Sequence, residues 1–159
     1  MSSRIVLLPA VMMAIWLIGA EVWRGVAPES ALFGDRRPGS LEQAISGRAG
    51  VDVVYDLLRD RDPNQLLTVT DPSLAGDGAI AVSPLVLAAA AGDPDVVQML
   101  LDNGATAAAP ANRMAWCVAQ DNGGEAAARM IEVALNGAQP SCPPVDQSDR
   151  GSLRRFVTR

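Results

Sequence analysis

The chain contains no histidine and no lysine, and it has only one tyrosine, two phenylalanines, three tryptophans and two cysteines. All thirteen basic residues are therefore arginine. Without histidine or lysine there is no imidazole base or imidazole metal ligand, no Schiff-base amine and no phosphate-loop lysine. These absences exclude the commonest catalytic centres. We expect no enzymatic activity, no cofactor and no small-molecule substrate.

Charge is distributed unevenly along the 159 residues, whose net charge is −5. The segment from Glu29 to Cys142 contains fifteen acidic residues and seven arginines. The last seventeen residues contain four arginines and only two acidic residues, Asp146 and Asp149. An acidic body repels phosphate backbones, so nucleic acid is not expected as a ligand. The basic segment 143–159 is expected to be a solvated tail, and the alternative is that it docks on an acidic partner or an anionic membrane surface.

The N-terminal segment is the longest uncharged run, from Ile5 to Ala20. Counting on to Trp23 brings it near the length that a bilayer needs, and Trp16 and Trp23 suit the interface. The alternative is a signal peptide cleaved after Ala20. We favour a retained single-pass anchor over residues 1–24, which reaches the membrane through residues 5–23, followed by a linker over 25–39. An export-like core places the main domain on the exported, periplasmic side; after cleavage it would be periplasmic or secreted.

The most regular stretch runs from Ser83 to Ala105. Ser83 and Pro84 are a helix cap and first-turn pair, and Gly92 ends that helix. Asp93 and Pro94 repeat the cap, and Val96, Val97, Leu100 and Leu101 form one apolar stripe. The pattern predicts a helical hairpin that needs neighbours to cover its stripe.

Two further segments repeat this arrangement. Downstream, a short helix near Met114 to Ala119 precedes the apolar positions Met130, Ile131, Val133 and Leu135, and Gly104 to Gly137 is a step of 33 residues. Upstream, Val53, Val54, Leu57 and Leu58 form the stripe, and Val54 to Val97 is a step of 43 residues. About ten extra residues therefore lie between the first and second units.

The central unit resembles the ankyrin repeat. Twelve positions match that family's pattern in register: Ser83, Pro84, Leu85, Ala88, Ala89, Gly92, Val96, Val97, Leu100, Leu101, Gly104 and Ala105. Val86 and Asp93 stand where the family has two histidines, so the inter-repeat hydrogen bonds of those histidines are absent.

The resemblance implies an all-α stack of antiparallel helical hairpins over residues 40–142, behind the N-terminal hydrophobic helix. We expect repeats at about 40–64, 83–108 and 113–141, with an inserted loop at 65–82. The function that it implies is protein binding. The alternative is a structural accessory subunit of a larger membrane protein complex, held there by the N-terminal helix.

Four residues match part of a calcium-binding loop: Asp60, Asp62, Asn64 and Asp71. Gln65 replaces the glycine that allows the sharp bend of such a loop, and the ankyrin turn explains Asp62 to Asn64 without a metal. We therefore predict no metal site. Asp52, Asp56 and Asp60 share one helical face, which we interpret as solvated.

Recognition is expected in the inserted loop, because long loops on rigid scaffolds often carry it. Asp71 and Asp77 in this loop are candidate partner contacts, as is Trp116 near a repeat tip; Trp116 alternatively packs against the neighbouring hairpin. Cys117 and Cys142 come close in the hairpin scheme, which predicts a disulfide if the compartment is oxidising.

Overall fold

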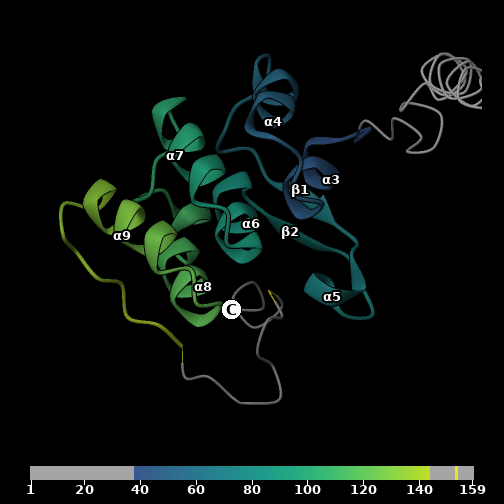
Figure 1. Cartoon of the computed structure of the whole chain (residues 1–159). Coiled ribbons are helices and arrows are strands. Elements are labelled where there is room, and N and C mark those ends of the chain that lie inside the picture. Colours follow the sequence, from purple (N-terminus) through teal and green to yellow (C-terminus); the bar gives the residue numbers. More distant parts are fainter. Residues whose placement is uncertain (1–37, 144–152, 154–159) are drawn as a thin grey trace, which may run out of the picture. The chain divides into compact units, whose positions relative to one another are not determined.

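Three helix pairs, stacked side by side, make up most of the computed structural model, which describes residues 38–143 and residue 153 (Figure 1). The described residues all belong to one unit, Pro38–Arg159. The pairs are α3 with α4 (Leu41–Ser46, Val51–Leu58), α6 with α7 (Pro84–Ala91, Pro94–Asp102), and α8 with α9 (Ala115–Asp121, Glu125–Ala134). A short 3-10 helix, η1 (Pro110–Asn112), leads into the last pair.

The first helices of the pairs form one layer and the second helices form another. Helix α6 packs between α3 and α8, while α7 packs between α4 and α9 (Figure 1). We call α4, α7 and α9 the outer helices. This arrangement leaves the outer helices as a continuous surface of the stack.

The central pair begins and ends as its sequence predicts. The Ser83 hydroxyl accepts a hydrogen bond from the Val86 amide at 3.2 Å, and Gly92 adopts φ 66°, the left-handed conformation that glycine tolerates best. The Asp93 carboxylate accepts from the amides of Asp95 and Val96. Both predicted caps are confirmed.

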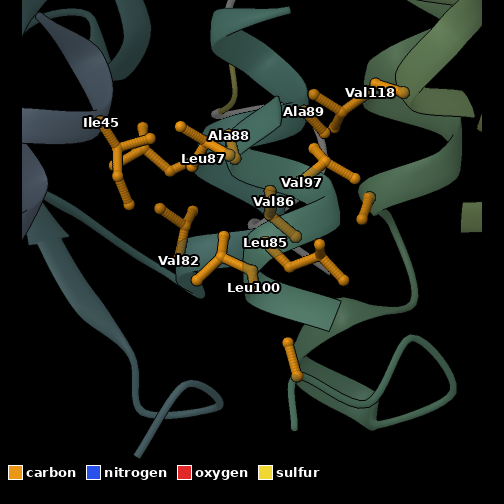
Figure 2. Close-up of a cluster of buried hydrophobic side chains, with 14 of the residues drawn as sticks. Ile45, Val82, Leu85, Val86, Leu87, Ala88, Ala89, Val97, Leu100 and Val118 are labelled. Carbon is orange, nitrogen blue, oxygen red and sulfur yellow. The ribbon is translucent and has the colours of Figure 1, made fainter. Parts of the chain in front are cut away.

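Helix α6 is the centre of the core because it is buried on nearly all sides. Its side chains from Pro84 to Ala89 are all buried, and those of α3, α7 and α8 close around it (Figure 2). The small residues Ala88 and Ala89, both 0% exposed, let the flanking helices approach closely. The long apolar stretch at Ser83 is therefore the packing centre of the domain.

The inserted loop is structured, so the expectation of an all-α domain is wrong there and the domain is mostly helical. Strands β1 (Leu67–Val69) and β2 (Ile80–Val82) pair antiparallel, with the short helix α5 (Pro72–Ala75) between them. Alternation explains the pairing, since Val69, Ile80 and Val82 are buried while Thr68 and Ala81 face solvent. The buried side chains fix this hairpin to the core.

One predicted stripe position is wrong. Val133 of α9 is 77% exposed, whereas Ala127, Ala128 and Ile131 face the core. Val133 lies two residues after Ile131, about 200° around the helix, so it points away from the buried face. A valine in the last helix of the stack is consequently left uncovered.

Inter-repeat hydrogen bonds are present even though the two family histidines are missing. The Arg48 guanidinium donates to the Ala91 carbonyl at 2.6 Å, and Nδ2 of the Asn122 side chain donates to the Ala90 carbonyl at 3.3 Å. The end of α6 is thus bonded to the repeats on both sides.

A second bridge joins the first repeat to the central repeat through Asn64. Its Oδ1 accepts from the Thr106 amide and from Asn112 Nδ2, both at 2.9 Å, while its Nδ2 donates to the Gly104 carbonyl at 3.1 Å. Asn112 is 1% exposed and also donates to the Thr106 carbonyl. Asparagine is needed at 64 because the bridge requires a donor and an acceptor in one side chain.

Replacing Asn64 with alanine is expected to lower the free energy of unfolding by about 1–3 kcal/mol, since the buried Asn112 side chain and the exposed turn at Gly104 and Thr106 lose a hydrogen-bond partner. Urea denaturation of the oxidised full-length protein in a non-ionic detergent measures the effect. The matched control is Gln65→Ala at the exposed neighbouring position, where we expect a change within about 0.5 kcal/mol. Equal effects at the two positions would show that the bridge contributes nothing.

Candidate partner-binding surface

A shallow, open groove lies between two of the outer helices, α4 and α7, and we call it the acidic groove. It has a volume of about 480 Å³, and its lining includes Asp52 and Tyr55 of α4 and Asp95, Met99 and Asp102 of α7. Asp52 and Asp95 lie in the first turns of their helices, whereas Asp102 is the last residue of α7. Three carboxylates therefore surround an opening with an aromatic ring and a thioether in it.

A second groove lies between α7 and α9, and we call it the apolar groove. Its volume is about 440 Å³, and Leu101, Met130 and Val133 supply its apolar lining. Gln98 and Asp102 line both grooves, so the two hollows meet along α7. Together they form a surface that crosses all three outer helices.

Sequence reasoning missed this surface. It placed Val133 in the core, and it made no use of Tyr55, which is 43% exposed. A signal was present in α4: Val54 and Leu58 occupy the buried face four residues apart, so Tyr55 begins the next face of the helix. The prediction that Asp52, Asp56 and Asp60 are solvated is confirmed, because all three are exposed.

The inserted hairpin carries the two predicted acidic contacts, Asp71 and Asp77, at separate places. Asp71 caps α5: its Oδ1 accepts hydrogen bonds from the Ser73 hydroxyl at 2.6 Å and the Ser73 amide at 2.8 Å. These two hydrogen bonds hold the pKa of Asp71 below its ordinary value, and the bond from the Ser73 hydroxyl has the larger effect. Asp77 is exposed between α5 and β2. Asp71 thus has a structural role, and partner binding by either residue stays a prediction.

Three of the four residues of the partial calcium match have structural roles. Asn64 forms the inter-repeat bridge, Asp62 accepts from the Asn64 amide at 2.8 Å, and Asp71 caps α5 beyond strand β1. Asp60 is exposed. Within residues 38–143 and 153 there is no group of three or more His, Cys, Asp or Glu side chains that could hold a metal ion.

Trp116 lies on α8 and is half-buried against the hydrophobic core. This position agrees with the alternative in which the ring packs on the neighbouring hairpin. Its remaining exposed part keeps it a candidate partner contact.

A disulfide joins Cys117 to Cys142, with their Cα atoms 5.5 Å apart. Cys117 is buried on α8 and Cys142 is exposed after α9, as the hairpin scheme places them. The bond ties the segment that follows α9 back to the first helix of the last repeat.

Leu153, one of the described residues of the basic C-terminal segment, is buried, which differs from the expectation of a solvated tail. Leu153 is 1% exposed within the core cluster, and its amide donates to the Leu74 carbonyl of α5 at 2.9 Å. Burial of the apolar Leu153 side chain is favourable, and the hairpin insert contributes to the site where it is buried.

The predicted membrane segment, with Trp16 and Trp23, lies outside the described residues. Among the residues that are described, no helix is long and apolar enough to cross a bilayer.

Comparison with known proteins gives one match. No curated protein and no solved structure matches the chain. The family model of the ankyrin repeat matches residues 82–112, which hold Val82, the whole α6–α7 pair and η1. The helix pair at the centre of the stack therefore matches the ankyrin repeat, as its sequence pattern predicts.

Proposed function

We propose that this protein is a membrane-anchored protein-binding module with no catalytic activity of its own. The observation that carries the proposal is the ankyrin repeat at residues 82–112, packed between two further helix pairs. Ankyrin repeats are typically non-catalytic interaction modules, and stacked repeats present extended surfaces that suit other proteins. The two grooves on the outer helices supply such a surface.

Membrane attachment rests on the sequence from Ile5 to Trp23, whose length and flanking tryptophans suit an anchor. The Cys117–Cys142 disulfide supports a location of the repeat domain on the exported side, because disulfides persist in oxidising compartments. In this arrangement the N-terminal helix confines the repeats near the membrane surface. A partner that is itself membrane-bound is then met at a high effective concentration.

The same features fit a structural accessory subunit, whose N-terminal helix packs among the helices of a larger membrane complex. The two roles differ in how the protein behaves when its partner is removed. A binding module stays folded in detergent without its partner, whereas an accessory subunit depends on its complex.

Solubilisation of native membranes with a gentle detergent, followed by native and intact mass measurement, tests the proposal. We expect a chain of full length, lighter by two hydrogens because of the disulfide, in complex with another protein and able to dissociate from it folded. A soluble chain without its first twenty or so residues would contradict the anchor. A chain found only as a free monomer, even after cross-linking, would contradict protein binding.

A further inference from the structure

The surface formed by the acidic and apolar grooves has a distinct pattern of charge. Asp52, Asp95 and Asp102 line the acidic groove, and no arginine does. Arg59 and Arg61 line a neighbouring hollow at the C-terminal end of α4. Arg129, in the apolar groove, is held by Glu125 at 3.2 Å. The charged side chains that line the acidic groove are therefore all acidic, although most of its lining is uncharged.

Helix stability does not explain all of these carboxylates. An acid in the first turn of a helix is favourable, which accounts for Asp52 and Asp95. Asp102 ends α7, where the helix dipole disfavours a negative charge. It is held in place by a hydrogen bond from Gln98 Nε2 at 2.8 Å. Since Asp102 and Gln98 are also the residues that the two grooves share, this carboxylate lies at the centre of the surface.

The same surface gathers exposed apolar side chains. Three large apolar residues in the described part of the chain are exposed, and two of them, Tyr55 and Val133, line these grooves. A cation placed over the Tyr55 ring, beside the carboxylates, would form both an ion pair and a cation–π interaction. Val133 is 77% exposed, so an apolar partner side chain that covers it would bury apolar surface and favour binding.

We propose that the joined grooves bind an amphipathic segment of the partner protein, with arginine or lysine over the acidic groove and apolar side chains in the apolar groove. Charge complementarity selects this occupant. A neutral segment would leave three carboxylates without a counter-charge, and an acidic segment would be repelled by them. A helix laid across α7 spans both grooves in the helix-in-groove mode. The inference rests on the proposed function and adds the chemistry of the partner and the face that it meets.

Binding of a defined peptide to the full-length oxidised protein in non-ionic detergent tests the inference. The probe is a fluorescent amphipathic peptide of leucine and arginine, about 18 residues and thus about five helical turns long. A second peptide carries glutamate at each arginine position. We expect the arginine peptide to bind and the glutamate peptide not to bind. Raising ionic strength from about 0.05 to about 0.5 M should weaken binding.

Matched variants separate the groove from the general attraction of an acidic protein. The triple variant Asp52→Asn, Asp95→Asn, Asp102→Asn should weaken binding about tenfold, because each of the three exposed charges contributes modestly to the binding free energy. The control variant Asp56→Asn, Asp60→Asn, Asp62→Asn removes the same charge from exposed positions outside the grooves and should change affinity less than about twofold. Val133→Ser, at an exposed site, should weaken binding without altering the fold.

Equal loss in the two triple variants would overturn the inference, because it would show attraction by net charge alone. Binding that appears only after removal of Arg154–Arg159 would also overturn it, since the chain's own tail would then occupy the groove. A native partner that remains bound to the groove variant would refute the inference and leave the proposed function standing. The absence of any native partner from the wild-type protein would refute the proposed function itself.

Discussion

Reducing the Cys117–Cys142 disulfide is expected to lower the free energy of unfolding by about 3.5 kcal/mol. The two cysteines are 25 residues apart in sequence, and in the chain-entropy model a cross-link of that span restricts the unfolded chain by this amount. The bond closes the last repeat, which has a neighbouring pair on one side only. Because this is a large share of the stability of a domain of ordinary size, the last repeat should unfold at much lower urea concentrations.

The substitution Cys142→Ser measures this effect cleanly, since Cys142 is exposed and Cys117 is buried. Urea denaturation with and without a reducing agent gives the comparison. We expect the reductant to lower the stability of the wild-type protein to that of the Cys142→Ser variant, and to leave the variant unchanged. A wild-type loss below about 1 kcal/mol would contradict a stabilising cross-link.

Replacing Leu153 with alanine is expected to lower the free energy of unfolding by about 2–5 kcal/mol, the range for truncating a fully buried leucine. The side chain is 1% exposed in the core cluster, and its amide bonds to Leu74. A leucine in a solvated tail would instead tolerate the change within about 0.5 kcal/mol. The two outcomes differ enough for one denaturation curve to separate them.

Leu153→Met serves as the control, because it keeps the volume and the apolar character and should cost less than about 1.5 kcal/mol. Leu66→Ala, at a leucine that is 53% exposed, should cost still less. A loss at Leu153→Ala no larger than at Leu66→Ala would contradict the docking of the C-terminal segment.

The sequence predicts the central repeat well because its signals are local. Ser83 and Asp93 cap their helices through atoms two or three residues away, and Gly92 needs only its own backbone freedom. The disulfide was predictable from the same regularity. Once the hairpins are in register, Cys117 and Cys142 fall at the same end of the last repeat.

What the sequence does not predict depends on contacts between distant residues. The strands Leu67–Val69 and Ile80–Val82 are three residues each, too short for alternation to distinguish them from a loop. Burial of Leu153 requires the hairpin insert that receives it. The binding surface requires helices from three repeats, and only the assembled stack shows that Tyr55 and Val133 line joined grooves.

The most direct test is photo-cross-linking in the native cell, with a photoreactive amino acid placed in turn at Tyr55, Val133, Asp77 and Trp116. If the outer helices bind the partner, positions 55 and 133 should each give one discrete adduct with the same protein. Both adducts should be lost in the Asp52→Asn, Asp95→Asn, Asp102→Asn variant. Discrete adducts only from positions 77 and 116, with none from 55 and 133, would contradict binding by the outer helices.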